Sequence, residues 1–378
     1  MFNNLLKLFK KEYLTLNKIE ISKSALTSNY HYLSSLSPKL KITPVLKSNA
    51  YGHGIIEAAK ILDPEKAPYF CVDSLYEAYQ LLKAKVKTPI LIMGYTNPQN
   101  FKVKKLPFTF AVYDLTMAKI LNSYQWDAKV HIKVDTGMHR LGVPLKDLPQ
   151  FLKEIKKLTN LKVEGLMSHF ASAKNTRDPL FLKQVGNFKR ARQMVKMAGF
   201  NLKWSHLTAS EGLLNPEARK IITQFTNLAR SGRALYGIPP SEKVTRLQPV
   251  LKLVTHIAQI KTIAKGERVG YDGTYIAKKE TTLGLLPIGY FDGVDRRLSN
   301  KGFGMIDGVE CPITGKVSMN ITAVDITKVK NPELGQEVVV YSNHTEDKNS
   351  VFNNAKICQT IPYEILVHLV PSTRRVIV

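Results

Sequence analysis

The feature that most constrains the fold is a regular alternation between Ile19 and about Pro239. Short apolar, β-branched runs alternate there with stretches whose apolar residues recur at helical spacing. Strands are predicted at residues 19–21, 42–46, 69–72, 90–93, 108–112, 130–134, 163–167, 202–207 and 234–236, and helices at 23–35, 55–62, 75–83, 115–121, 146–157 and 178–197. About eight such repeats are typical of a (β/α)8 barrel. An open doubly wound sheet is the alternative, because periodicity does not decide closure.

The pattern changes after Pro239-Pro240. Strand-like runs with glycine turns follow at residues 250–263, 269–275, 281–288, 302–306, 323–326 and 338–341, and they predict a second, mostly β domain. The proline pair marks a plausible boundary. We therefore expect an N-terminal extension at residues 1–16, a barrel at 17–240 and a β domain at 241–378.

Composition narrows the class of protein. The hydrophobic fraction of 44% is enough for sizeable cores. Three widely spaced cysteines form neither a disulfide framework nor a metal motif, which favours a reducing, cytoplasmic setting. No apolar run reaches the roughly 18 residues of a membrane span. The first residues have helically spaced apolar positions between lysines, which predicts an amphipathic extension and not a signal peptide.

The net charge of +25 raises the question of nucleic-acid binding. The lysines are spread along the whole chain, however, with only short clusters such as residues 102–105. The sequence contains no zinc-finger or RNP signature and no basic helix interleaved with aromatic residues. A solvated, lysine-rich surface is therefore the better interpretation.

Lys47 stands where a predicted strand ends and a Gly-rich turn begins. Barrels and open α/β sheets place reactive groups at such strand ends, and lysine is the side chain that forms Schiff bases. Alone, such a lysine is usually a surface residue, and the chain holds 55 lysines and arginines. The whole segment at residues 47–54, Lys-Ser-Asn-Ala-Tyr-Gly-His-Gly, closely resembles the pyridoxal-phosphate lysine motif of alanine racemases. The resemblance implies that Lys47 carries the cofactor and that Tyr51 binds its phosphate.

A second segment, Arg-Ser-Gly-Arg-Ala-Leu-Tyr-Gly at residues 230–237, is similar to another motif of that family. The resemblance implies that Arg230 hydrogen-bonds the pyridine nitrogen, while Gly232, Arg233 and Ser210 surround the phosphate. Because arginine does not readily give up its proton, the ring stays unprotonated, which weakens the electron sink and suits racemisation more than transamination. Ala209 stands where the family has asparagine before the serine.

Racemisation needs two acid–base groups on opposite faces of the reacting carbon. The resemblance assigns these roles to Lys47 and to Tyr271, in Val-Gly-Tyr-Asp-Gly at residues 269–273. A phenol is protonated at neutral pH and needs help to act as a base, and family resemblance supplies that help through His169, linked to the tyrosine and to Arg230. In the family the tyrosine reaches the site of the partner subunit, so a homodimer with shared active sites is implied.

Further motifs complete the resemblance. Lys133 to Gly142 is similar to a family run in which Arg140 binds the substrate carboxylate and the lysine at position 133 is often carbamylated. The resemblance also implies that the backbone of Met319 contacts the substrate carboxylate. It implies that Tyr363 lies at the inner gate of the site entrance and is one of the cofactor-binding residues. Three residues depart from the family pattern at the site entrance and leave the substrate range open: Lys174, Lys316 and Asn320.

Together these segments resemble the alanine racemase family from Asn17 to Arg375. The function implied is the pyridoxal-phosphate-dependent interconversion of L- and D-alanine, supplying D-alanine for peptidoglycan, by a cytoplasmic enzyme that uses no metal. A broader-range amino-acid racemase is the first alternative. A decarboxylase is less favoured, because such sites place an acidic residue on the pyridine nitrogen, where this chain offers Arg230. A non-enzymatic cofactor carrier resembles the barrel alone and is disfavoured by the β domain.

Overall fold

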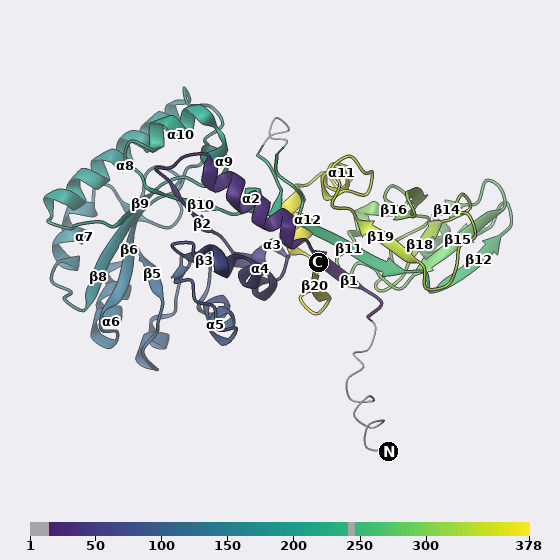
Figure 1. Ribbon diagram of the computed structural model, residues 1–378, viewed down its shortest axis with the longest axis horizontal. Helices are drawn as coiled ribbons and strands as arrows, with labels where there is room; N and C mark the ends of the chain where they lie inside the picture. The colour runs from purple at the N-terminus through teal and green to yellow at the C-terminus, as the bar shows by residue number, and fades with distance from the viewer. Residues whose placement is uncertain (1–14, 241–245) are drawn as a thin grey trace, which may run out of the picture. The chain divides into compact units, whose positions relative to one another are not determined.

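A computed structural model describes residues 15–240 and 246–378. Residues 1–14, most of the predicted N-terminal extension, lie outside the described residues. The described residues divide into two compact units, one within residues 22–250 and one formed by residues 15–21 together with 251–378 (Figure 1).

Within the described residues, the unit at 22–250 contains eight parallel strands that form a ring. They are β2 (Lys41–Pro44), β3 (Phe70–Val72), β4 (Ile90–Ile92), β5 (Thr109–Val112), β6 (Ala128–Asp135), β8 (Leu161–Met167), β9 (Trp204–His206) and β10 (Leu228–Ser231). Strands β3 to β9 pair in chain order, and β10 pairs with β2. A bridge between Val45 and Cys71 joins β2 to β3, and the Asn227 N–H donates to the Ser205 carbonyl at 3.0 Å between β9 and β10. The predicted barrel is confirmed.

Helices cover the outside of the strands (Figure 1). They are α2 (Lys23–Ser35), α4 (Ile55–Leu62), α5 (Leu75–Lys83), α6 (Leu115–Tyr124), α7 (Leu148–Ile155), α8 (Pro179–Met197), α9 (Ser210–Leu214) and α10 (Pro216–Ile222), with 3-10 helices η1 (Asp63–Glu65), η2 (Pro98–Lys102) and η3 (Arg233–Tyr236) and the short strand β7 (Val143–Pro144). The segment labelled α3 (Lys47–Tyr51) is a turn with left-handed φ angles and not a covering helix. Their N-termini follow local chemistry: the Ser22 and Ser74 hydroxyls accept from the first turns of α2 and α5.

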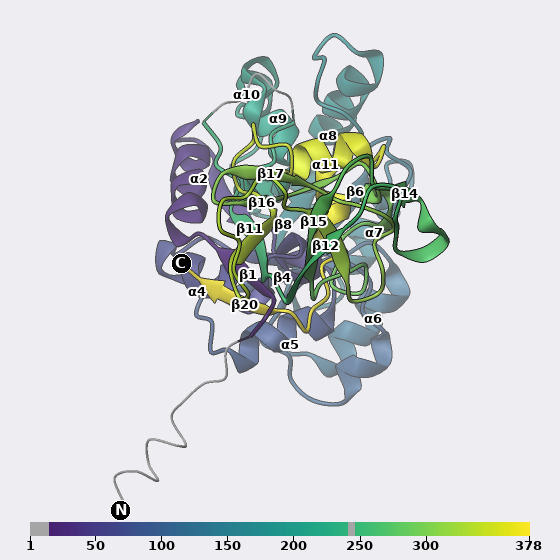
Figure 2. The same cartoon turned by 90° about the vertical axis from the view of Figure 1, so that its right-hand side faces the viewer.

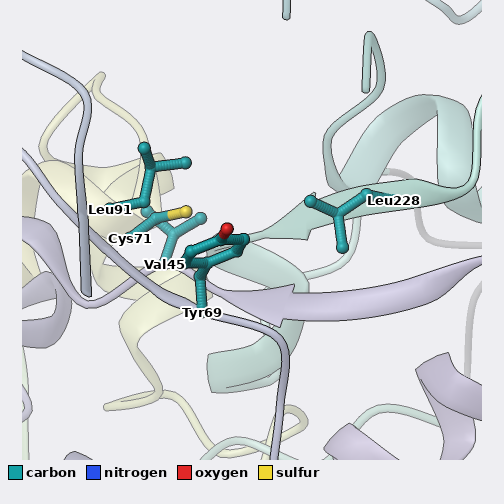
Figure 3. Close-up of a cluster of buried hydrophobic side chains, with 5 residues drawn as sticks. All are labelled: Val45, Tyr69, Cys71, Leu91 and Leu228. Atoms are coloured by element: carbon teal, nitrogen blue, oxygen red, sulfur yellow. The ribbon is translucent and has the colours of Figure 1, made fainter. Parts of the chain in front are cut away.

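The barrel strands are buried on both faces, as parallel strands covered by helices require. All residues of β3, β4, β5 and β10 are buried. One core cluster joins side chains from neighbouring strands and is drawn in Figure 3: Val45, Tyr69, Cys71, Leu91 and Leu228. Burial raises the pKa of the Cys71 thiol to about 12, so this cysteine is an inert part of the core.

The last predicted barrel strand was misplaced. Residues 234–236 belong to η3, and the strand is β10, one turn earlier in the chain. After Ser231 the chain turns at Gly232 (φ −106°, ψ −97°). The apolar run at 234–236 predicted a strand because its residues are suited to burial, and they are indeed buried. The Leu235 carbonyl, however, accepts from Asn29 Nδ2 of α2 at 3.1 Å and not from a neighbouring strand.

The second unit is mostly β-structure, as predicted. Its six-stranded sheet has the order β17-β16-β19-β11-β1-β20. Figure 2 shows β20, near the C-terminus, beside β1. The elements are β1 (Lys18–Ile21), β11 (Leu251–His256), β12 (Gln259–Ile263), β13 (Arg268–Val269), η4 (Tyr271–Gly273), β14 (Tyr275–Ile276), β15 (Thr281–Leu286), η5 (Arg296–Leu298), β16 (Phe303–Ile306), β17 (Val309–Pro312), β18 (Thr322–Asp325), β19 (Glu337–Tyr341), α11 (Val351–Ile357), α12 (Pro362–Val367) and β20 (Arg374–Ile377). Strands β12, β15 and β18 form a second sheet, and β13 and β14 form a hairpin.

Strand β1 differs from the sequence expectation, which assigned it to the barrel. It pairs antiparallel with β11 and parallel with β20. Its burial alternates, with Ile19 and Ile21 buried and their neighbours half-buried. That pattern is typical of a sheet with one covered face and not of a barrel strand.

Candidate active site

Lys47 begins a turn of unusual backbone conformation at the end of β2. Four consecutive non-glycine residues have left-handed φ angles: Ser48 (56°), Asn49 (53°), Ala50 (54°) and Tyr51 (54°). Each such residue costs about 1–2 kcal/mol relative to a right-handed one. Strain of this kind persists only where neighbouring contacts hold it, and it gathers at functional sites. The Lys47 side chain is 37% exposed, and its Nζ lies 4.0 Å from Asp73 Oδ1.

One side chain of the turn itself and one from α5 hold this turn. Asn49 Oδ1 accepts from the Ile55 N–H at 2.8 Å and so caps α4. Glu77 Oε1 accepts from the Ser48 N–H at 2.6 Å. Glu77 belongs to none of the sequence motifs that predict the site. Its sequence signal is the Ser74-x-x-Glu77 capping box, which predicts a helix start but not a contact with Ser48.

A small cradle of donors lies beside the turn. A Cβ built on Gly232 would lie only 2.3 Å from the Tyr51 hydroxyl, so only glycine admits the phenol here. Ser210 Oγ accepts from the Ala234 N–H at 3.3 Å, which places the start of α9 beside the start of η3. Arg233, the first residue of η3, pairs with Glu211. Hydroxyls and backbone N–H groups around a position without a side chain are what a phosphate group needs.

Arg230 is the buried cation of the barrel. It is 3% exposed, and burial lowers its pKa to about 10, so it stays charged at neutral pH. Its Nη2 donates to the Ser168 carbonyl at 2.6 Å and to His169 Nδ1 at 3.0 Å. Its Nη1 donates to His206 Nδ1 at 2.5 Å. Among the described residues, no carboxylate forms an ion pair with it.

A line of neutral imidazoles follows from this arrangement. Because His206 Nδ1 accepts from Arg230, its proton is on Nε2, which donates to His131 Nδ1 at 2.8 Å. Burial, helped by the charge of Arg230, lowers the pKa of His131 to about 3 and that of His169 to about 3. The predicted pair of Arg230 and His169 is therefore present in the structure.

Positive charge converges at this end of the barrel. Burial, followed by the charges of Arg230 and Arg140, lowers the pKa of Lys133 to about 8. Lys47 also contributes to that shift, while Asp73 opposes it. The arrangement attracts an anion and leaves part of Lys133 neutral near pH 8.

Arg140 lies on an exposed loop whose backbone is held by the side chain of Asp135. Asp135 Oδ1 accepts from the N–H groups of Gly137, Met138 and His139 at 2.9–3.1 Å. The structure therefore brings together Lys47, Tyr51, Lys133, Arg140, His169, Ser210, Arg230, Gly232 and Arg233 on one unit. Lys174 is exposed, and Ala209 starts α9 without a side-chain cap.

Tyr271 lies in the other unit and is 69% exposed. The sequence pattern predicted a strand there, but the residue occupies the 3-10 turn η4 between β13 and β14, because Gly270, Asp272 and Gly273 all have positive φ. Lys316 Nζ pairs with Asp272 Oδ2 beside it. Asn300 also braces the turn by donating to Thr274 Oγ1 at 3.0 Å.

Met319, Asn320 and Tyr363 also lie in this unit. Met319 is 55% exposed, and its carbonyl accepts from the Phe291 N–H at 3.0 Å. Tyr363 lies half-buried in α12. The predicted link between Tyr271 and His169 joins the two units and stays a prediction.

Within the part of the chain that the structure describes, no group of histidine, cysteine, aspartate or glutamate side chains is arranged to hold a metal ion. No helix of residues 15–240 or 246–378 is long and apolar enough to cross a membrane.

Comparison with known proteins identifies the same family in both units. A family model described as "Alanine racemase, N-terminal domain" matches residues 21–240, and one described as "Alanine racemase, C-terminal domain" matches residues 250–377. The chain is 33% identical to alanine racemase 1 of Caldanaerobacter subterraneus subsp. tengcongensis over 95% of this chain and 94% of that protein.

Solved structures give the same result. The chain is similar to an alanine racemase of Clostridium difficile 630 with a TM-score of 0.88 and 30% identity, covering 97% of both chains. A structure of alanine racemase from Bacillus anthracis with bound L-Ala-P matches with a TM-score of 0.87 and 29% identity, over 97% of this chain and 96% of that one.

Proposed function

The chain belongs to the alanine racemase family, and from this premise we propose that it interconverts L- and D-alanine with pyridoxal phosphate as cofactor. The observation that carries the proposal is the meeting of Lys47, the Tyr51–Gly232 cradle and Arg230 at one end of the barrel. The donor set fits the cofactor: an amine for its aldehyde, hydroxyl and amide donors for its phosphate, and a cation without a carboxylate partner for its ring nitrogen.

Bound pyridoxal phosphate supplies an electron sink that acidifies the Cα–H bond of an amino acid. Lys47 Nζ would hold the cofactor and, once an amino acid has displaced the lysine, would exchange the Cα proton on one face. Tyr271 would exchange it on the other face. Arg140 would bind the substrate carboxylate, aided by the backbone of Met319, and Tyr363 would narrow the entrance. Arg230 would donate a hydrogen bond to the ring nitrogen without protonating it.

We propose that Lys133 carries a carbamate. Its lowered pKa leaves a neutral amine fraction, the form that reacts with carbon dioxide. The resulting negative charge would offset the cations Arg140 and Arg230 beside it. Labelled ¹³C-bicarbonate should give a carbamate carbon signal that Lys133→Ala removes; an identical signal in the variant would refute the assignment.

We propose a homodimer in which Tyr271 of the partner subunit completes each site. Exposed apolar side chains support this proposal. Tyr271, Phe291, Met319 and Ile321 are each more than half exposed, and backbone bonds place residues 290–291 beside 318–319. Exposed apolar side chains that lie together, as Phe291 and Met319 do, favour a protein interface.

The reaction is tested by deuterium uptake at Cα from D2O, with the cofactor-loaded protein. Exchange with inversion should be far faster for alanine than for serine, lysine, arginine or glutamate. Lys47→Ala should abolish it, and full activity in this variant would refute the proposal. Such an enzyme would supply D-alanine for peptidoglycan from the cytoplasm.

A broader-range racemase is the second candidate. Lys174 and Asn320 at the predicted entrance favour it, but Lys316 does not, because Asp272 neutralises it. Comparable inversion of several amino acids in the same panel would select this alternative.

A further inference from the structure

Glu77 receives hydrogen bonds from two different strand ends. Its Oε1 accepts from the N–H groups of Ser48 at 2.6 Å and Asn49 at 3.4 Å, directly after Lys47. Its Oε2 accepts from the N–H groups of Asp73 at 2.9 Å and Ser74 at 3.4 Å, directly after β3. One half-buried carboxylate therefore ties the turn that carries Lys47 to the first turn of α5.

The contact falls where the backbone needs support. The left-handed turn begins at Ser48, and its later N–H groups bond inside the turn: Ala50 to the Leu46 carbonyl at 2.8 Å and Gly52 to the Ser48 carbonyl at 3.1 Å. The first two N–H groups point instead at Glu77. A negative charge is a strong acceptor for backbone N–H groups, and α5 presents its own N-terminus to the same carboxylate.

The position of Glu77 on α5 is fixed independently of this role. The Glu77 N–H donates to Ser74 Oγ at 3.2 Å, which completes the capping box. The carboxylate therefore extends from a rigid helix start, and its two oxygens reach two segments that are neighbours only in the folded barrel.

We propose that Glu77 is a positioning residue for Lys47: it holds the left-handed turn so that the Lys47 amine meets the substrate carbon from one fixed direction. This inference rests on the proposed function of Lys47. A proton transfer depends steeply on the placement of its base, and displacement by about 1 Å costs up to about 100-fold in rate. Glu77 itself takes no part in the chemistry.

The test is Glu77→Gln, which keeps the side-chain size. A glutamine offers one acceptor oxygen where four N–H donors converge, so one pair of donors must face its amide N–H2. We expect amide hydrogen exchange in the peptide at residues 47–54 of the cofactor-free protein to speed up by about tenfold, the ratio for one lost charge-assisted bond. In the cofactor-loaded enzyme, kcat should fall by about tenfold with KM for alanine changed by less than about twofold.

Two controls separate positioning from helix stability. Ser74→Ala breaks the capping box but leaves the Glu77 carboxylate, so exchange should rise at residues 75–83 and not at 47–54. Asp114→Asn alters a matched carboxylate cap, which accepts from the Met117 N–H of α6 at 2.8 Å, and should leave residues 47–54 unchanged.

Glu77→Asp is the second variant, because it retains the charge. Its shorter side chain should reach one segment only, giving kcat between those of wild type and Glu77→Gln. Unchanged exchange at 47–54 in a folded Glu77→Gln protein, or a loss confined to KM, would overturn the inference. Failure of the proposed function would instead appear as a wild-type protein without racemase activity.

Discussion

At the scale of single residues, the interior of the barrel is organised around the charge of Arg230. It is bonded to imidazole nitrogens and carbonyl oxygens and not to a carboxylate. An acidic partner would neutralise the guanidinium and lower its value as a donor to a ring nitrogen. The imidazoles accept from its Nη1 and Nη2 and leave the positive charge in place.

These imidazoles predict a loss of stability in acid. The folded pKa of His131 is about 3, below the unfolded value near 6.5, so between these values the unfolded chain binds one more proton. Its contribution is present above pH 6.5 and is lost as the pH falls toward 3, at about 1.4 kcal/mol per pH unit. His131→Asn removes the titrating imidazole but keeps a side-chain amide that can accept the hydrogen bond from His206.

Urea unfolding at several pH values measures this slope. The free energy of unfolding of His131→Asn should fall less steeply than that of the wild type between pH 6 and 4, by about that amount. Near pH 8 the two slopes should coincide. Equal slopes throughout would show that His131 is not buried as a neutral group.

Gly232 gives a second prediction at this scale. In Gly232→Ala the new methyl group would collide with the Tyr51 hydroxyl and move the phenol. We expect pyridoxal phosphate to bind about 10–100-fold more weakly, the range for one lost bond to a charged group. Fluorescence titration of the cofactor measures this. Gly186→Ala on α8 is the control, since its Cβ would meet nothing within 4 Å; an equal loss there would contradict the cradle.

At the scale of elements, the sequence predicted best where local chemistry decides. Helix α4 was predicted with its observed ends, and α2 with its Ser22 cap, because caps and apolar spacing are local signals. The prediction failed where partners distant in the chain decide. Residues 234–236 are apolar and buried, and Leu235 is bonded to Asn29 of α2, 206 positions earlier in the chain. The partner strands of β1 are also far from it in the chain. For the site, motif residues were predictable, but Glu77 was not, since its second contact exists only in the folded barrel.

The start of α2 supplies a prediction of stability. Ser22 Oγ accepts from the Ala25 N–H at 3.2 Å. Ser22→Ala should lower the free energy of unfolding by about 1 kcal/mol, as for other serine caps. Urea unfolding tests this against Ser35→Ala, whose exposed hydroxyl only donates to the Tyr32 carbonyl in the last turn. A larger loss in Ser35→Ala would contradict the role of the cap.

At the scale of the whole molecule, the proposed sharing of each site between two subunits predicts complementation. Lys47→Ala and Tyr271→Phe should each be inactive as homodimers. Mixed dimers, formed by co-expression, hold one site with both native residues, so an equal mixture should regain about a quarter of wild-type activity. Lys133 and Arg230 are intact in both chains. A mixture that stays inactive, although mass spectrometry detects mixed dimers, would place Lys47 and Tyr271 of one site on the same chain.

The pairing of β1 with β11 and β20 has a consequence for synthesis. The ribosome delivers residues 18–21 long before the partner strands at 251–256 and 374–377. At about 5–20 residues per second, β1 waits for tens of seconds with both edges unpaired. The barrel at residues 22–250 is contiguous and is delivered whole in that interval. Translation therefore makes the barrel the first domain to fold, while the sheet that contains the earliest described strand is completed last.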